Sequence, residues 1–213
     1  MTYSTQYETC VPRGASFSRP GAATGECCAG RKPGEERGQV SGMADSLTLR
    51  RYRPVDRDRA LDLHERAMRE VGAYVEGVPD PDLDDIESAY LESGGEFLVG
   101  TVDGEVVAMG AFRPAEGYVT GLLDDLENAA EIKRMRVAPA RQGRGYGRQV
   151  YDELERRARE RGFDELALDT TPAQTAAQAL YESVGFELAR RERLEHDGES
   201  VTLLLYRKPL DGE

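Results

Sequence analysis

Hydrophobic positions recur along the chain at two spacings, one typical of strands and one typical of helices. Alternating apolar and polar residues predict strands over 96–101 and 105–112, and Asp103-Gly104 between them suits the tight turn of a hairpin. Apolar residues three and four apart predict helices. These helices cover 56–71, 81–93, 144–161 and 172–184. Further strands are predicted over 47–53, 131–137, 166–169, 186–193 and 200–208.

The predicted order is β α α β β β α β α β β, without an internal repeat. It indicates one mixed α/β domain over residues 43–213, with a central, mostly antiparallel sheet flanked by helices. Residues 1–42 are rich in Gly, Ser, Pro and Arg and follow neither spacing, so we expect a disordered tail or a wrongly assigned start, with Met43 as the alternative first residue. They contain no apolar stretch of the kind that signal peptides have.

Composition narrows the class of protein. The formal net charge is −12, which disfavours a nucleic-acid partner because phosphate groups repel an acidic surface. The longest apolar run, Val106 to Phe112, is far shorter than the roughly 20 residues that span a bilayer, so no membrane partner is expected. All three cysteines lie before residue 29, which excludes a disulfide framework for the domain and predicts a reducing, cytoplasmic setting without a metal site.

The charged residues are unevenly chosen, with 40 acids against 28 bases, of which only Lys32, Lys133 and Lys208 are lysines. An acid-rich, lysine-poor surface is typical of proteins that work in concentrated salt, where screening weakens self-repulsion. We therefore predict a halophilic protein. Its thermal unfolding temperature should fall sharply when KCl is diluted from molar to millimolar concentration, and a temperature that does not respond to salt would contradict this prediction.

The most informative segment joins a strand to a helix through a glycine-rich turn, Gln142-Gly143-Arg144-Gly145-Tyr146-Gly147. Glycines let the backbone come close to a ligand, and the first N–H groups of a helix favour an anion. Residues 131–148 also hold six cationic side chains and one acid in an otherwise acidic protein. A phosphorylated ligand would account for this cluster, although a solvated connection remains the simpler alternative. The segment has neither a Walker motif nor the first glycine phase of a dinucleotide fold.

These residues carry a family resemblance. The turn resembles the [Q/R]-x-x-G-x-[G/A] signature of the GCN5-related N-acetyltransferase (GNAT) superfamily. The preceding Glu131-Ile-Lys-Arg-Met-Arg-Val-Ala-Pro139 and the later Leu180-Tyr181 with Gly185-Phe186 are similar to that family as well. The resemblance covers residues 47–208. It implies the GNAT fold, acetyl-CoA as co-substrate, no metal, and transfer of an acetyl group to a primary amine.

The resemblance also implies residue roles. Backbone amides of Gln142, Gly143, Arg144, Gly145, Tyr146 and Gly147, together with Arg148, would hold the diphosphate. The strand residues Met135, Arg136 and Val137 would run beside the pantetheine arm, and an N–H near Met135 or Arg136 would polarise the thioester carbonyl. Gln174 stands where the family often has an asparagine that contacts the cofactor. It also fits the last position of a capping box, Thr171-Pro-Ala-Gln, which is an equally good interpretation.

Two residues are the predicted catalytic groups. Tyr181 resembles the family's general acid, which protonates the departing thiolate, and its alternative is packing beside Leu180. Glu131 stands at the family's usual location for the general base. His64, on an apolar helix face, is the rival candidate, and an ordered water is a third route for the proton.

The acceptor is less defined than the cofactor. Residues 70–112 contain eleven acids and no Lys or Arg, which either attract cationic amines or simply form halophilic surface. A small molecule or a peptide amine fits equally well, and a homodimer is common in the family. Because the domain has no cysteine, a cysteine-linked acetyl-enzyme is excluded, and direct attack in a ternary complex is predicted. The competing function is a non-catalytic acyl-CoA-binding regulatory module.

Overall fold

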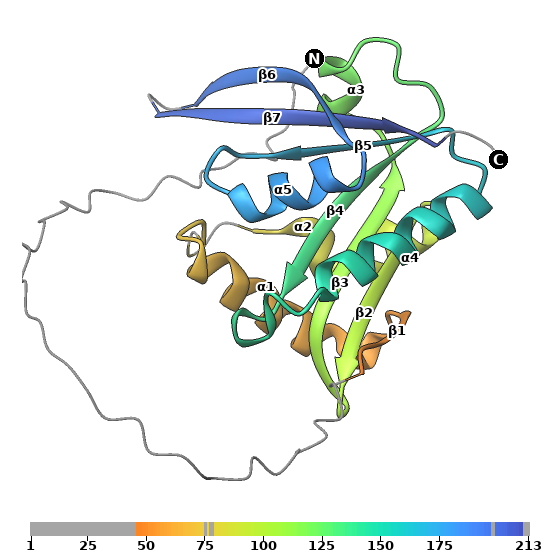
Figure 1. The fold of residues 1–213 in the computed structure, drawn as a ribbon, viewed down its shortest axis with the longest axis vertical. Coiled ribbons are helices and arrows are strands. Elements are labelled where there is room, and N and C mark those ends of the chain that lie inside the picture. Colours follow the sequence, from red (N-terminus) through yellow and green to blue (C-terminus); the bar gives the residue numbers. More distant parts are fainter. Residues whose placement is uncertain (1–45, 75, 77–78, 197–198, 211–213) are drawn as a thin grey trace, which may run out of the picture.

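The computed structural model describes residues 46–210 except 75, 77–78 and 197–198 (Figure 1). The predicted tail, Met43 and the tip of the last hairpin lie outside these residues. The strands are β1 (Thr48–Arg51), β2 (Glu96–Val102), β3 (Glu105–Pro114), β4 (Ala129–Val137), β5 (Glu165–Thr170), β6 (Glu187–His196) and β7 (Glu199–Pro209). The α-helices are α1 (Arg57–Glu70), α2 (Pro81–Asp84), α3 (Tyr118–Leu122), α4 (Tyr146–Glu160) and α5 (Thr175–Ser183). Short helical turns are η1 (Pro54–Asp56), η2 (Glu87–Glu92) and η3 (Pro139–Arg141).

The seven strands form one sheet in the order β1-β2-β3-β4-β5-β7-β6. Every neighbouring pair is antiparallel except β4 and β5, which are parallel. This confirms the mixed α/β class and the mostly antiparallel sheet flanked by helices. The single parallel pair follows from the chain path, because α4 connects β4 to β5 and returns the chain to the same end of the sheet.

Helices cover the sheet on both faces. On one face, α4 packs so closely that a Cβ on Gly110 of β3 would collide with Val150 and Leu154. On the other, Tyr90 of η2 packs edge-on against Phe97 of β2, with ring centroids 5.4 Å apart. Most buried apolar residues belong to this continuous core. The core therefore anchors the last part of β4 and the beginning of α4, the two segments that carried the family resemblance.

Three expectations are corrected by the structure. The helix predicted over 81–93 is split into α2 and the π-helical turn η2, and the Tyr90 hydroxyl of η2 donates a hydrogen bond to the Asp82 carboxylate of α2. The sequence predicts no helix or strand between residues 112 and 131, but this segment contains α3. Val119 of α3 and Leu123 just after it are buried in a cluster with Ala167 of β5 and with leucines of β7. The predicted helix over 172–184 begins later, at Thr175.

No helix in the described part of the chain combines the length and the apolar character that crossing a bilayer requires.

Candidate functional site

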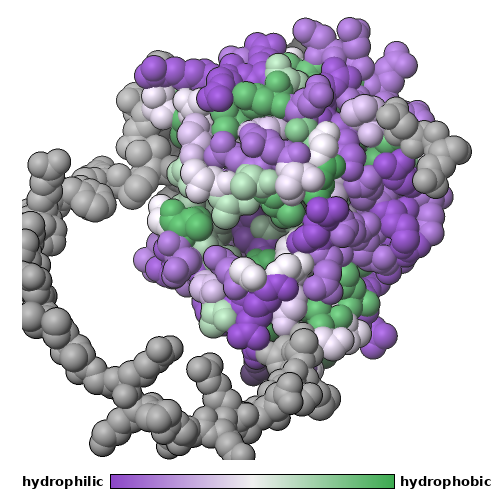
Figure 2. Space-filling view, in the orientation of Figure 1, coloured by the Kyte–Doolittle hydropathy of each residue, from purple (hydrophilic) through white to green (hydrophobic). Residues whose placement is uncertain are grey.

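The two parallel strands separate soon after they begin to pair. The ladder joins Ala129–Glu131 of β4 to Glu165–Ala167 of β5, but β4 continues to Val137 and β5 to Thr170. Figure 1 shows the strands diverging beyond this point. Figure 2 shows a hollow at the matching place, between α1, α5 and the beginning of α4, with a hydrophilic bottom and partly hydrophobic walls. The sheet is therefore opened at its centre.

The glycine-rich turn lies where α4 begins. Gly143 and Gly145 have φ of +73° and +79°, and a Cβ on either would meet no atom within 4 Å. Gly145 is the N-cap of α4 and has no side chain to bond the first N–H groups of the helix. Those groups and the helix dipole face open space, which is the arrangement that binds phosphate. Gly147 fits between β4 and α5, within ordinary contact of Val137 and Leu180.

Two side chains that were predicted to contribute to diphosphate binding form contacts with nearby residues of the protein. Gln142 donates its amide to the carbonyl of Val137 at 3.3 Å, which ties the turn to the end of β4. Arg148 forms an ion pair with Asp152 on the same helix, with 2.7 Å between Nε and Oδ1. The described contacts therefore assign the anion-binding character of this corner chiefly to the backbone.

Tyr181 on α5 is buried, with 6% of its surface exposed, and packs edge-on against Phe186 at 5.6 Å between ring centroids. Burial raises the pKa of its hydroxyl to about 12, an effect that Arg136 opposes and Asp169 reinforces. Tyr181 is thus protonated at neutral pH. Because Arg136 and Asp169 come from β4 and β5, their influence places Tyr181 beside the opening between these strands.

Glu131 is completely buried, and both carboxylate oxygens are ion-paired. Oε2 lies 3.2 Å from Nε of Arg113, and Oε1 lies 3.0 Å from Nζ of Lys133. A carboxylate held in this way stabilises two neighbouring cations, and it would have to weaken one pair to accept a proton. The role of Glu131 as general base stays a prediction.

A bulge in β4 could not be seen in the sequence. Lys133 pairs with Ala111 and Arg136 with Met109, so Arg134 and Met135 together face Gly110. Arg134 has φ of +55°, in the left-handed region. Its guanidinium reaches Asp82 at 2.5 and 2.8 Å and Asp80 at 2.8 Å. The bulge thus directs the Arg134 guanidinium toward Asp80, which precedes α2, and Asp82 within α2. Arg134 therefore neutralises two of the acids in the segment that was considered for attracting cationic amines.

Three further residues meet at the opening, and none of them was a predicted catalytic or cofactor-binding residue. The Tyr118 hydroxyl of α3 donates a hydrogen bond to the Asp169 carboxylate of β5. The Lys133 ammonium lies 6.0 Å from the centroid of the Tyr118 ring. Burial raises the pKa of Asp169, although Lys133 and two arginines of β4 oppose the shift. Only one feature of the sequence pointed to Asp169, namely that this acid directly follows the buried run Leu166 to Leu168.

His64 of α1 and Arg136 of β4 each have a buried nitrogen without a hydrogen-bond partner. His64 on α1 is 5% exposed, and its Nε2 lies 3.1 Å from Oδ2 of Asp80. Burial lowers the pKa of His64, and Arg136 and Arg134 lower it further, while Asp80 opposes them. Arg136 donates from Nη1 to the carbonyl of Met135 at 2.8 Å. Both side chains retain a buried nitrogen that has no hydrogen-bond partner.

Gln174 does not close a capping box. It is the N-cap residue of α5 and makes no capping bond, and its Oε1 instead accepts a hydrogen bond from Thr170 at 2.9 Å. The contact fixes Gln174 at the end of β5, beside the opening. Its contact with a cofactor stays a prediction.

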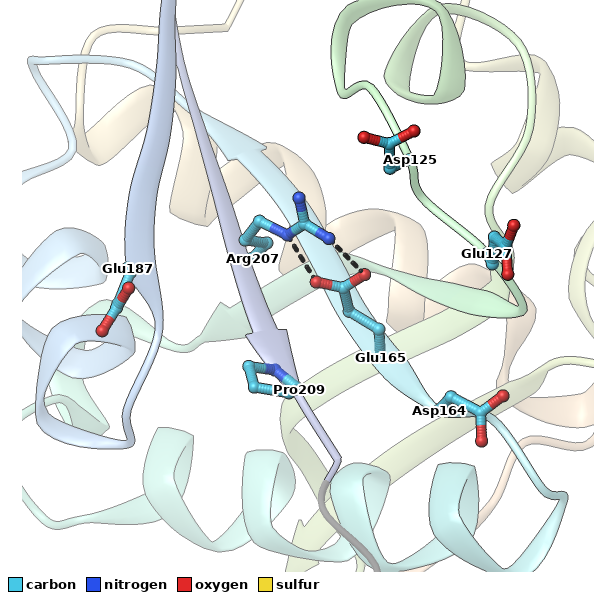
Figure 3. A pocket seen from close by; sticks show the side chains of 7 residues that line it. All are labelled: Asp125, Glu127, Asp164, Glu165, Glu187, Arg207 and Pro209. Carbon is cyan, nitrogen blue, oxygen red and sulfur yellow. Dashed lines mark hydrogen bonds and ion pairs between the residues drawn. The ribbon is translucent and has the colours of Figure 1, made fainter.

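A separate surface pocket lies at the other end of β5 (Figure 3). It is lined by Asp125, Glu127, Asp164, Glu165, Glu187, Arg207 and Pro209. Arg207 bonds both oxygens of Glu165, at 2.5 and 2.8 Å, so the one cation and one of the acids neutralise each other. Among the described residues, no group of three or more His, Cys, Asp or Glu side chains could hold a metal ion.

Comparisons with known proteins agree on one family. The profile of the acetyltransferase (GNAT) family matches residues 58–186. The uncharacterized N-acetyltransferase YjgM of Escherichia coli is 36% identical over 110 residues, which are 52% of this chain and 62% of YjgM. Human N-acetylaspartate synthetase is 32% identical over 117 residues, covering 54% and 36% of the two chains. The matched region is thus less than two thirds of these relatives' own length.

Solved structures show the same fold. A GNAT-family acetyltransferase of Staphylococcus aureus superposes with a TM-score of 0.65 at 20% identity, covering 78% of this chain and all of the other. YncA of Salmonella typhimurium, solved with its cofactor acetyl-CoA, gives a TM-score of 0.63 at 22% identity, with 78% and 95% covered.

Proposed function

This chain belongs to the acetyltransferase (GNAT) family, and we propose that it transfers the acetyl group of acetyl-CoA to a primary amine by direct attack in a ternary complex. One observation carries the proposal. An anion-binding turn, an opening between parallel strands and a buried, protonated tyrosine occur within one site. The relatives named as N-acetyltransferases and the acetyl-CoA in the structure of YncA support the same activity.

The residues of the site fit acetyl-CoA. Open space over Gly143 and Gly145 leaves room for a diphosphate against the first amides of α4. Beyond Glu131, the side of β4 that faces β5 has no strand partner in the ladder, so it can pair with an extended, amide-containing arm. Bound there, acetyl-CoA would supply an activated acyl carbon.

The chain's own groups then manage the protons. The backbone near Met135 and Arg136 would polarise the carbonyl by donating an N–H group, and Tyr181 would give its proton to the sulfur as the C–S bond breaks. The acceptor ammonium must lose one proton before its nitrogen forms the new C–N bond, and a second afterwards. Glu131 is the predicted base, and the unpartnered Nδ1 of His64 is the rival. One of these protons leaves to solvent, and the other restores Tyr181.

Replacing Gly145 by alanine tests the binding step. Gly145 has φ of +79°, which an alanine adopts with strain, so the turn should move out of its anion-binding geometry. We expect the Kd for acetyl-CoA, measured by isothermal titration calorimetry, to rise by about tenfold or more.

Gly104→Ala is the matched control. Gly104 has φ of +81° and, like Gly145, open space where a Cβ would stand, but it lies in the β2–β3 turn. Both variants should lose about 1 kcal/mol of stability, and only Gly145→Ala should lose affinity. Equal affinities in the two variants would contradict the assigned site. Release of free thiol when amines are added separates an enzyme from the acyl-CoA-binding regulatory module, which would bind acetyl-CoA without turnover.

A further inference from the structure

Unsatisfied buried groups at the site carry information about the acceptor. Three side-chain atoms of the described residues are buried without a hydrogen-bond partner, namely Nδ1 of His64, Nε of Arg136 and Oε1 of Glu96. Oε1 of Glu96 lies 2.9 Å from Nε of Arg51, so an ion pair compensates it. The remaining two are His64 and Arg136. A buried polar atom left unpaired costs about 1–3 kcal/mol, which makes a missing partner the simplest explanation.

The two side chains that bear these atoms come from elements that pack together. α1, which bears His64, packs against β4, which bears Arg136, and the charge of Arg136 is felt at His64. Arg136 also acts electrostatically on Tyr181, the proposed acid. The pair is therefore electrostatically linked to the proposed acid Tyr181.

The two atoms have opposite hydrogen-bonding character. His64 keeps its proton on Nε2, where Asp80 accepts it, and Arg134 in turn holds Asp80. Burial and the two arginines keep the ring neutral, so Nδ1 carries a lone pair and can only accept. Nε of Arg136 carries a hydrogen and can only donate. A ligand that satisfies both atoms must therefore offer both a donor and an acceptor.

The charges around the site point to an anionic acceptor group. Asp80 and Asp82 compensate Arg134, and Glu131 compensates Arg113 and Lys133. Arg136 bonds only the carbonyl of Met135 and has no carboxylate within ion-pair distance among the described residues. The Arg136 guanidinium therefore lacks an ion-pair partner among the described residues, and the charges of Asp80 and Asp169 act on it without a direct contact. A polyamine would add positive charge beside it, whereas a carboxylate would neutralise it.

We propose that the acceptor is a free amino acid, whose carboxylate accepts from Arg136 while its amino group donates to Nδ1 of His64. This inference rests on the proposed acetyl transfer and narrows its substrate class. The adjacent amine and carboxylate of an amino acid supply the donor and the acceptor that the two orphaned atoms lack. Held in this way, the amine would face the acyl carbon as a nucleophile once its ammonium proton has been removed.

The test compares substrates that differ only in the carboxylate. Thiol release is measured with the common L-amino acids, with the matching L-amino acid amides, with a short peptide and with spermidine. We expect the best amino acid to exceed its own amide in kcat/KM by about tenfold or more, because the amide leaves Arg136 unneutralised. Amides, the peptide or spermidine reacting as well as the amino acids would overturn the inference.

Arg136→Gln provides the second arm. It keeps a donor but removes the charge, so it should raise KM for the amino acid and bring the acid-to-amide ratio close to one. His64→Asn should raise KM for the acid and the amide alike. An unchanged acid-to-amide ratio in Arg136→Gln would overturn the assignment, and if that variant does not fold, the comparison of acid with amide in the natural protein still decides.

The experiments give a different result if the proposed acetyl transfer itself is wrong. In that case acetyl-CoA would give no heat of binding, or no amine in the panel would release thiol. Failure of the substrate inference alone would leave acetyl-CoA binding and thiol release intact, and only the preference for the carboxylate would be absent.

Discussion

Replacing Tyr181 by phenylalanine is expected to lower kcat for acetyl transfer by about 10²-fold or more, with little change in KM for acetyl-CoA. The hydroxyl is the only group removed, and positioned proton donors contribute about 10²–10⁴-fold. The ring would keep its edge-on contact with Phe186, so the variant should fold normally. Steady-state kinetics with the best amino acid would measure the split between kcat and KM.

The environment of Tyr181 explains why the hydroxyl matters and why it needs help. A pKa of about 12 keeps the proton in place at neutral pH, yet it also makes the phenol a reluctant donor to a thiolate. Arg136 is the group that opposes this rise. Its positive charge would stabilise the phenolate as the proton leaves, which links acid catalysis to the residue that we assign to the acceptor carboxylate.

Tyr151→Phe is a closely matched control. Tyr151 on α4 is also buried, and its ring packs edge-on against the same Phe186, at 5.8 Å. Its hydroxyl accepts a hydrogen bond from Lys208 at 3.1 Å, outside the opening between β4 and β5. This variant should lose some stability and retain kcat. A comparable fall in kcat in both variants, or none in Tyr181→Phe, would show that Tyr181 only packs.

Glu131→Gln should have the largest effect on stability, lowering the free energy of unfolding by about 3–5 kcal/mol. Among the described residues, the change removes the only carboxylate that forms an ion pair with Arg113 and Lys133, whose side chains are 11% and 17% exposed. A buried cation without its partner is costly because it has lost its hydration and gained nothing in return. Urea denaturation of the two proteins at the same salt concentration would measure the difference.

A surface pair gives the control for this variant. Glu160 pairs with Arg156 one turn away on α4, with 59% and 52% of the side chains exposed. Glu160→Gln should change stability by less than about 0.5 kcal/mol. A loss in Glu131→Gln no greater than this would mean that the buried cluster contributes little. Turnover per folded molecule in Glu131→Gln then reports separately on the predicted role of Glu131 as base.

The cofactor side of the site was accessible to sequence reasoning because its geometry is local. The glycines of the turn, the strand before it and the helix after it are contiguous, so their pattern and the family resemblance together predicted an anion site at Gly143 to Gly147. The structure keeps this arrangement, with positive φ at Gly143 and Gly145. Tyr181 was predicted from a motif, and Arg136 as part of the strand beside the pantetheine arm. Their proximity to each other and to Asp169 was not predicted, since strands from different parts of the chain bring these groups together.

Several misjudged elements share one cause, which is that tertiary contacts override a local pattern. Residues 81–93 have helical spacing, but Tyr90 donates to Asp82, Asp82 accepts from Arg134, and the helix breaks between Asp82 and Tyr90. α3 is too short to show a period, and burial of Val119 and Leu123 stabilises it. Gln174 fits a capping box in sequence, but its bond to Thr170 gives it another position.

By itself, the sequence determined the mixed α/β class of the fold and predicted the glycine-rich turn as a diphosphate site, because periodicity and glycine chemistry act over a few residues. Only the tertiary structure decided which charges are neutralised. It pairs Arg134 with acids 52 and 54 positions away, encloses Glu131 between two cations, and leaves His64 and Arg136 with one unpartnered atom each. Compensation of buried charge depends on distance in space, and the proposed acceptor is inferred from it.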